Sequence, residues 1–209
     1  MDASLWAGVG VAGASLIGWL WLTFLRGSFW RTDQQLMEDR PRAGEGDWPS
    51  ATAVVPARDE AAVLPETLTT LLGQEYPGEL RVIVVDDRSA DGTAEVARRL
   101  ARESGAKARL RVVEGQPLPH GWAGKVWALQ QGVAGSMVLP PDFFLFTDAD
   151  VSHGPHILRS LVARAVRDDL QLVSLMARLR TGTMWERLLI PAFVYFFAKL
   201  FPFRRVNDP

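Results

Sequence analysis

The chain of 209 residues carries 24 acidic and 23 basic side chains, a formal net charge of −1, and 48% of its residues are hydrophobic. This balance excludes disorder as the state of most of the chain, and it gives no electrostatic reason to expect a nucleic-acid partner. The sequence contains no cysteine. Disulfides, thiol nucleophiles and cysteine metal sites are therefore excluded, and any metal must bind oxygen or imidazole ligands.

An uncharged run from Leu5 to Leu25 lies near the start of the chain. Its length matches the roughly 20 residues that a helix needs to cross a bilayer. Arg26 follows the run, so we expect residues 1–30 to be a single transmembrane anchor in the inner (cytoplasmic) membrane, with the following domain in the cytoplasm. A cleaved signal peptide, the main alternative, has a basic stretch before its apolar core. A buried core helix is the third alternative.

Glycine, proline and charged residues make residues 31–50 a polar linker. Beyond it, strand and helix patterns alternate. The apolar, strand-like runs are Ala51–Ala57, Leu80–Val85, Leu110–Val113, Phe143–Thr147 and Leu172–Leu179. The helical patterns between them are Glu60–Leu72, Asp91–Arg102, Ala123–Gly132 and His156–Arg167. This alternation predicts an α/β domain over residues 51–182, with a mainly parallel sheet flanked by helices on both faces.

Charged segments follow three of the predicted strands. The first strand leads into Pro56-Ala57-Arg58-Asp59-Glu60, the second into Asp86-Asp87-Arg88-Ser89, and the fourth into Asp148-Ala149-Asp150. Open parallel sheets bind ligands in the crevice at the carboxyl ends of their strands. We therefore expect the three segments to meet at one ligand-binding edge.

Asp148 and Asp150 flank one small residue directly after a buried strand. Two carboxylates this close repel each other unless a cation lies between them. Hard oxygen ligands suit Mg²⁺ or Mn²⁺, which in turn bind a diphosphate. The alternative is a turn with two solvated aspartates. His153 follows closely and could ligate the metal or orient a ligand, although a structural hydrogen bond is the preferred interpretation.

Asp86 and Asp87 end the second predicted strand. Carboxylates at a strand end can accept hydrogen bonds from a pyrimidine N–H or a ribose hydroxyl. Alternatively, Asp87 and Ser89 cap the following helix. The two roles are compatible, because Asp91 could cap that helix while Asp86 or Asp87 binds a ligand.

Arg58 and Lys125 are the basic candidates at this edge. Arg58 could pair with a phosphate or lie against a base, or it could form an ion pair with Asp59 or Glu60. Lys125 lies near a predicted helix start, where backbone N–H groups and an ammonium suit a phosphate. A solvated surface lysine is the alternative for Lys125.

Together these segments resemble the family 2 glycosyltransferases, nucleotide-sugar-using enzymes with the GT-A (Rossmann-like) fold. The resemblance runs from about Ala51 to Leu179. It is carried, in order, by Val54-Val55-Pro56-Ala57-Arg58-Asp59-Glu60, Val84-Val85-Asp86-Asp87-Arg88-Ser89-Ala90-Asp91-Gly92-Thr93, Gly124-Lys125 and Thr147-Asp148-Ala149-Asp150. Two further segments are similar to those of hopanoid-biosynthesis-associated membrane glycosyltransferases: Pro119-His120-Gly121-Trp122-Ala123-Gly124-Lys125 and Phe201-Pro202-Phe203-Arg204-Arg205-Val206-Asn207-Asp208-Pro209.

The resemblance implies roles for the residues at the predicted edge. The positions implied to bind the nucleotide sugar are Pro56, Arg58, Glu60, Asp86, Asp87, Lys125 and Asp148, and those implied to hold Mg²⁺ or Mn²⁺ are Asp148 and Asp150. The implied reaction is a single displacement with inversion at the anomeric carbon, in which a carboxylate base deprotonates an acceptor hydroxyl. Because apolar segments lie at both ends of the chain, we expect the acceptor to be a lipid in the hopanoid or membrane-glycolipid context.

Relatives in this family place the base in an acidic motif downstream of the D-x-D. The acidic residues after Asp150 are Asp168, Asp169, Glu186 and Asp208, and none lies in a recognisable version of that motif. We therefore expect a chain truncated at its C-terminus. The alternative to a transferase is a catalytically inactive, membrane-tethered remnant that binds nucleotide sugars. Residues 183–209 are expected to form an amphipathic or membrane-interface segment, or a core helix without its downstream partners.

Two other enzyme classes bind nucleotides on similar sheets. A Rossmann-type dehydrogenase or methyltransferase has a glycine-rich turn after the first strand, and a sugar nucleotidylyltransferase would need a glycine-rich loop at the same place. Here that turn is Pro56-Ala57-Arg58-Asp59-Glu60, which contains no glycine. The sequence therefore disfavours both classes.

Overall fold

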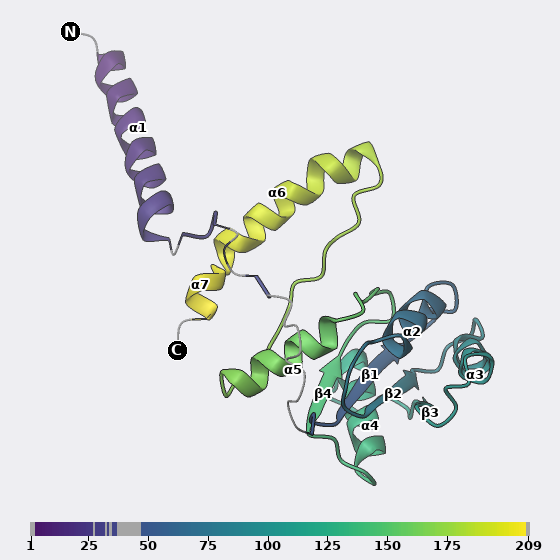
Figure 1. Ribbon diagram of the computed structural model, residues 1–209. Coiled ribbons are helices and arrows are strands. Elements are labelled where there is room, and N and C mark those ends of the chain that lie inside the picture. The colour runs from purple at the N-terminus through teal and green to yellow at the C-terminus, as the bar shows by residue number, and fades with distance from the viewer. Residues whose placement is uncertain (1–2, 27, 32, 34, 37–46, 208–209) are drawn as a thin grey trace. The chain divides into compact units, whose positions relative to one another are not determined.

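A computed structural model describes residues 3–26, 28–31, 33, 35–36 and 47–207. The chain divides into two compact units, one made of residues 37–175 and the other of residues 1–36 together with 176–209 (Figure 1). Residues 32, 34 and 37–46 of the predicted linker, and residues 208–209 of the predicted C-terminal motif, lie outside the described residues. Each unit is described by itself.

A four-stranded parallel sheet forms the centre of unit 37–175 (Figure 1). Its strands are β1 (Ala51–Ala57), β2 (Leu80–Asp86), β3 (Leu110–Glu114) and β4 (Phe143–Phe146), in the order β3-β2-β1-β4. Every pair is parallel, and Ala51 at the start of β1 pairs with both Leu80 and Phe143. The chain moves outward from β1 to β3 and then returns to β4 on the other side of β1. This reversal creates a switch point, where sheets of this kind form their ligand crevice.

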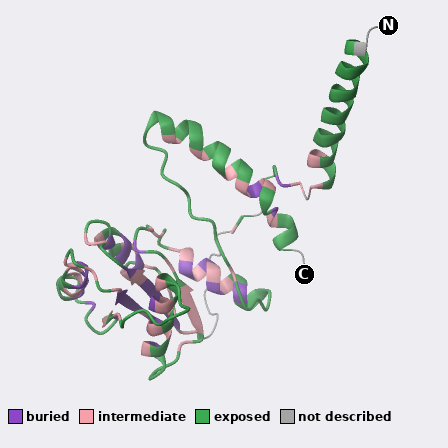
Figure 2. Cartoon of the chain, turned by 180° about the vertical axis from the view of Figure 1, so that it is seen from behind, coloured by how far each residue is buried: buried purple, intermediate pink, exposed green. Residues whose placement is uncertain are grey.

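Helices cover both faces of the sheet. They are α2 (Leu64–Leu72), α3 (Thr93–Glu103), α4 (Gly124–Ser136) and α5 (Ile157–Arg167). Alternate residues of β1 contact different helices: Val55 belongs to the core cluster with α2, α3 and α5, whereas Val54 belongs to the cluster with Ala128 of α4. Figure 2 shows the central strands as the most buried part of this unit. The predicted α/β fold with a parallel sheet between helices is confirmed.

Helix α4 approaches the sheet most closely at Gly132. A Cβ atom at this position would lie 2.3 Å from Cγ1 of Val54 and 3.1 Å from Cγ2 of Val85. Both valines are fully buried, so neither can move aside without disturbing the core. The glycine is therefore required by packing.

The Gly132→Ala substitution is expected to lower the free energy of unfolding by about 1–3 kcal/mol, the usual cost of an overpacked core. Gly135→Ala on the same helix is the matched control, because its Cβ would lie 3.6 Å from Val113, an ordinary contact. The control should be neutral or stabilised by up to about 1 kcal/mol, since alanine favours helices over glycine. Thermal unfolding in detergent, followed by circular dichroism, measures both. Equal melting of the two variants would contradict the packing at Gly132.

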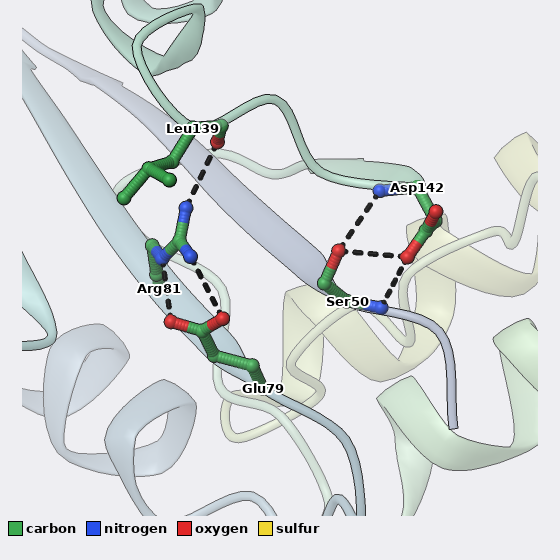
Figure 3. Close-up of polar contacts among 5 residues, drawn as sticks. All are labelled: Ser50, Glu79, Arg81, Leu139 and Asp142. Carbon is green, nitrogen blue, oxygen red and sulfur yellow. Dashed lines mark hydrogen bonds and ion pairs between the residues drawn. The ribbon is translucent and has the colours of Figure 1, made fainter. Parts of the chain in front are cut away.

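Side-chain contacts fix the amino-terminal edge of the sheet (Figure 3). Asp142 Oδ2 accepts hydrogen bonds from the backbone N of Ser50 (2.7 Å) and from its Oγ (2.8 Å), and these bonds hold the pKa of Asp142 below its usual range. Arg81 forms two 2.7 Å bonds with the Glu79 carboxylate and donates to the Leu139 carbonyl at 2.8 Å. The charged side chains of Glu79, Arg81 and Asp142 are therefore all bonded to other groups of the protein.

The prediction of a fifth strand over Leu172–Leu179 is wrong. Residues 171–182, all of them described, contain no strand. Residues 170–173 instead line a shallow hollow beside β4 and α5, and the Leu172 side chain is 82% exposed. An apolar run matches a strand pattern, but a strand forms only where a neighbouring strand supplies the inter-strand hydrogen bonds. Among the described residues, β4 is paired only with β1.

The other unit begins with α1 (Ala3–Leu20), which continues into a short π-helix, η1 (Trp21–Leu25). The predicted apolar run is therefore helical, with a wider last turn. Residues Ser4–Leu25 form a helix that is long and apolar enough to cross a membrane. Its large side chains are exposed (Figure 2).

The same unit ends with α6 (Met184–Leu200) and α7 (Phe203–Val206). A capping box starts α6: Glu186 N donates to Thr183 Oγ1 at 3.2 Å, and Thr183 N donates to Glu186 Oε2 at 2.8 Å. These bonds hold the pKa of Glu186 below its ordinary value. Apolar side chains along α6 are exposed, among them Trp185, Leu189 and Phe193.

Two arginines connect the end of η1 with the end of the chain, one through α6 and one through α7. Arg26 Nε donates to the carbonyl oxygen of Lys199 at 3.2 Å, and Arg205 Nη2 donates to the carbonyl oxygen of Leu25 at 2.7 Å. Each guanidinium thus satisfies a carbonyl that the other helix leaves unbonded at its C-terminus, where positive charge is favoured. The first and last described parts of the chain therefore form one unit.

Candidate functional site

The loops that follow β1 and β2 are hydrogen-bonded to each other. Asp59 N donates to Ser89 Oγ at 3.0 Å, and Ala90 N donates to Asp59 Oδ1 at 2.7 Å. Glu60 N donates to Thr93 Oγ1 at 2.9 Å. Asp59 also adopts a positive φ of 55°, a conformation that aspartate tolerates better than most residues. The charged segments after two neighbouring strands therefore form one rigid edge.

The sequence places the start of helix α3 at Asp91, but the helix begins two residues later, at Thr93. The cap residue is Gly92, with a φ of 86°, and Asp91 accepts hydrogen bonds from Thr93 Oγ1, Thr93 N and Ala61 N. The bond from the Thr93 hydroxyl, followed by that from Ala61, keeps the pKa of Asp91 below its ordinary value. Asp91 thus orders the start of α3 and also ties α3 to the loop after β1.

Asp87 lies at the carboxyl end of β2 and faces two other segments. Its Oδ2 is 3.7 Å from Nη1 of Arg58, and a Cβ atom built at Gly124 would lie 3.6 Å from the same oxygen. Arg58 therefore pairs with Asp87 and does not form the alternative pair with Asp59 or Glu60. Asp87 likewise does not cap α3, because that helix has no side-chain cap.

Lys125 is in the first turn of α4, and its Nζ forms an ion pair with Oδ1 of Asp148. Both side chains are more than half exposed, at 59% and 52%. The side chain contacts solvent, as the alternative of a solvated surface lysine predicts, and it also has an acidic partner. Exposed pairs of this kind contribute little stability, so breaking this pair costs little.

These contacts connect all four motif segments in space. Arg58 pairs with Asp87, Asp87 lies against the start of α4 at Gly124, and the next residue, Lys125, pairs with Asp148. The segments come from β1, β2, α4 and β4, and they meet at the carboxyl edge beside the switch point. The sequence-based expectation of one shared edge is confirmed for these residues.

The other predicted nucleotide-binding residues lie at the same strand ends. Asp86 is the last residue of β2, pairs with Ala57 and is 9% exposed. Pro56 is near the end of β1 and is partly buried, and Glu60 is partly buried in the loop that follows. Their position at the edge agrees with the expectation, while their contact with a ligand stays a prediction.

Asp148 and Asp150 both point away from the core because the residue between them points into it. Ala149 is 4% exposed and belongs to the core cluster that includes Leu64, whereas both aspartates are exposed. Within the part of the chain that the structure describes, no third Asp, Glu or His completes a protein-only metal site. Two hard carboxylates fit a Mg²⁺ or Mn²⁺ ion whose other ligands are phosphate oxygens and water.

His153 forms the structural hydrogen bond that its sequence position suggested. Its Nε2 lies 3.0 Å from Thr147 Oγ1, and its backbone N donates to Thr70 Oγ1 at 3.1 Å. Burial lowers the pKa of His153 from its ordinary value, so the ring is neutral near pH 7. His153 therefore links the two ends of the acidic loop.

Sequence patterns missed the residues of α2 that hold this loop. Thr67 is 1% exposed and donates to the carbonyl of Ala149 at 2.7 Å. The available signal was a hydroxyl at an apolar helical spacing, between Leu64 and Leu71. A buried hydroxyl needs a partner, but the sequence alone does not identify that partner.

The fold and this edge define an α/β protein with a cluster of mixed charge at the switch point of a parallel sheet. Residues 52–206 match the model of the glycosyl transferase family 2, and the chain belongs to that family. The family expected from the sequence motifs is thus confirmed.

Relatives of known name support the same assignment. The chain is 33% identical over 130 residues to a 4,4'-diaponeurosporenoate glycosyltransferase of Staphylococcus haemolyticus, covering 62% of this chain and 32% of the relative. It is 31% identical over 121 residues to an N-acetylglucosaminyltransferase of Rhizobium leguminosarum bv. viciae, covering 57% and 26%. The chain thus aligns with a third or less of the length of these relatives.

A solved structure has the same fold. It is the mannosyltransferase PcManGT from Pyrobaculum calidifontis in complex with GDP-Man and Mn²⁺, with 27% identity and a TM-score of 0.50. The similarity covers 71% of this chain and 42% of that one. The expected GT-A architecture is therefore confirmed.

Proposed function

We propose that the carboxyl edge of the sheet binds a nucleoside diphosphate sugar, and that the protein transfers the sugar to an acceptor hydroxyl with inversion at the anomeric carbon. The observation that carries this proposal is the line of contacts from Arg58 through Asp87 and Lys125 to Asp148. It brings carboxylates and cations from four separate segments to one edge, and a nucleoside diphosphate, which offers both hydrogen-bonding groups and phosphates, can contact all of them.

The nucleoside would lie over the ends of β1 and β2. Asp86 and Asp87 accept hydrogen bonds from the base or the ribose, and Arg58 lies beside Asp87 to contact a base or a phosphate. Pro56 and Glu60 complete the wall of this pocket. The half-buried position of Asp87, 16% exposed, strengthens such bonds relative to those at an open surface.

The diphosphate would lie over α4 and the loop after β4. Lys125 and the free N–H groups at the start of α4 attract phosphate oxygens, and Lys125 exchanges its contact with Asp148 for the ligand. Asp148 and Asp150 hold a divalent cation that neutralises the charge developing on the departing nucleoside diphosphate. The acceptor hydroxyl attacks the anomeric carbon as a carboxylate removes its proton.

The acceptor is proposed to be a lipid of the hopanoid or membrane-glycolipid class. Support comes from α1, which is long and apolar enough to cross a bilayer, and from the exposed aromatic side chains of α6. Arg26 follows the apolar helix, so the sugar-binding unit is proposed to lie on the cytoplasmic side of the inner membrane.

Isothermal titration calorimetry on the full chain in detergent tests the donor site. UDP-glucose, UDP-GlcNAc and GDP-mannose are each titrated with MnCl₂ or with EDTA. Binding of at least one donor is expected, with clearly higher affinity in Mn²⁺. No binding heat from any of the three, in a protein that melts cooperatively, would count against the proposal.

A second candidate function is binding without transfer. Three acidic residues are described after Asp150: Asp168 is paired with Arg164, Glu186 is engaged in its own helix cap, and Asp169 is exposed in the turn after α5. None of them belongs to an acidic motif of the kind that supplies the base. Sugar transfer by the purified chain to a polyprenyl phosphate or hopanoid alcohol would exclude this candidate. Donor binding without transfer would support it.

A further inference from the structure

One face of α2 contacts the acidic loop that follows β4. Thr67 Oγ1 donates to the carbonyl oxygen of Ala149 over 2.7 Å, and both groups are buried. One turn further on, Thr70 Oγ1 accepts a hydrogen bond from the backbone N of His153 at 3.1 Å. Residues three apart lie on the same side of a helix, so these two hydroxyls hold two points of the loop from one direction.

The contact continues beyond both ends of this pair. Gln74, in the turn after α2, donates from Nε2 to the carbonyl of Gly154 at 2.7 Å and accepts from Leu158 N at 3.0 Å. At the other end, Ser152 donates its hydroxyl to the Glu66 carboxylate. The loop from Ala149 to the start of α5 is therefore bonded along the whole length of α2.

Ala149 is the residue through which this contact reaches the aspartates. Its methyl group is buried in the core cluster with Leu64, and its carbonyl is held by Thr67. With its side chain buried and its carbonyl bonded, Ala149 restrains the backbone at this point of the loop. Asp148 and Asp150 on either side are exposed to solvent, and their backbone is held in place through Ala149.

We propose that Thr67 is a positioning residue for the acidic pair, and that α2 sets the geometry in which Asp148 and Asp150 hold a cation against the diphosphate. This inference rests on the proposed function. Thr67 is 1% exposed, so it acts on the ligand only through Ala149. A valine would have a similar shape but would leave the buried Ala149 carbonyl without this donor, so the hydroxyl has a directional role beyond packing.

Three substitutions on α2 separate this role from general stability. Thr67→Val keeps the shape and removes the hydroxyl, whereas Thr67→Ser keeps the hydroxyl. Thr69→Val is the matched control, because its hydroxyl bonds only within α2, to the Pro65 carbonyl at 2.7 Å. Each variant is compared by calorimetry with UDP and GDP in MnCl₂ and in EDTA, and by amide hydrogen exchange of residues 148–154.

Thr67→Val is expected to weaken Mn²⁺-dependent nucleotide binding about tenfold, because small displacements of ligating groups are costly, while binding in EDTA is unchanged. Amide exchange in the loop should accelerate. Thr67→Ser and Thr69→Val should match the wild type in both measurements.

Two results would overturn the positioning role. In one, Thr67→Val matches the wild type in Mn²⁺ affinity and in loop exchange. In the other, it loses affinity equally in Mn²⁺ and in EDTA, which would indicate a general loss of structure. Failure of the proposed function looks different, because the wild type itself would then bind neither nucleotide, and the exchange rates would still report whether Thr67 holds the loop.

Discussion

Replacing Asp150 with alanine is expected to lower the Mn²⁺-dependent affinity for UDP or GDP by at least about 10–100-fold. Mutation of a residue that only supports a metal ligand already lowers metal affinity by that factor. The protein supplies two exposed carboxylates at this place, Asp148 and Asp150. Asp148 is already shared with Lys125, so Asp150 provides the unshared negative charge. Its loss leaves Asp148 as the single carboxylate ligand for the cation.

Calorimetry in MnCl₂ and in EDTA measures this effect. The variant should bind nucleotide in MnCl₂ only as well as the wild type does in EDTA. Glu103→Ala, at the far end of α3, removes one exposed negative charge at a distance from the site and should behave as wild type. If Asp150→Ala retained the full Mn²⁺ enhancement, Asp150 would not be a metal ligand.

The sequence predicted the carboxyl edge of the sheet correctly, because the position of this edge depends on the local sequence pattern of each strand. Strand β2, for example, contains a continuous β-branched run over residues 82–85, and the carboxyl ends of parallel strands lie on the same side of a sheet. Once β1, β2 and β4 were recognised, the convergence of Asp87 and Asp148 followed from topology. It required no knowledge of individual contacts.

The features that the sequence did not predict each depend on a partner that is distant in the chain. Leu172–Leu179 has the apolar pattern of a strand, but a strand exists only beside another strand. For Arg58, the sequence-based alternative of an ion pair with its neighbours Asp59 or Glu60 is not the one formed, because its partner is Asp87, which belongs to another loop. A sequence pattern describes a residue's own preference, not which of several partners it will reach.

Thr67 combines both cases. Its place in the apolar stripe of α2 is visible in the sequence, and so is the anomaly of a hydroxyl there. Its partner, the carbonyl of Ala149, is 82 residues away, and a backbone carbonyl has no sequence signature. Residues that position a site by hydrogen-bonding to backbone are therefore the ones that motif reading misses.

Asp87→Asn is expected to weaken nucleotide binding about 10–150-fold, equally in MnCl₂ and in EDTA, because a hydrogen bond to a charged group contributes about 1.5–3 kcal/mol. The amide keeps the shape of the carboxylate but loses the charge that pairs with Arg58 and accepts bonds from the nucleoside. Calorimetry with UDP and GDP under both conditions separates this loss from that at Asp150, which concerns the metal-dependent part alone.

Asp59→Asn is the matched control for the charge at Asp87. Asp59 Oδ1 accepts a bond from Ala90 N at 2.7 Å, and the amide oxygen of asparagine can accept the same bond, so affinity should be retained although one negative charge is lost from the same edge. If Asp87→Asn lowered affinity only in MnCl₂, Asp87 would instead be assigned as a metal ligand. If its affinity were unchanged, Asp87 would not contact the nucleotide, and the nucleoside would have to bind away from the end of β2.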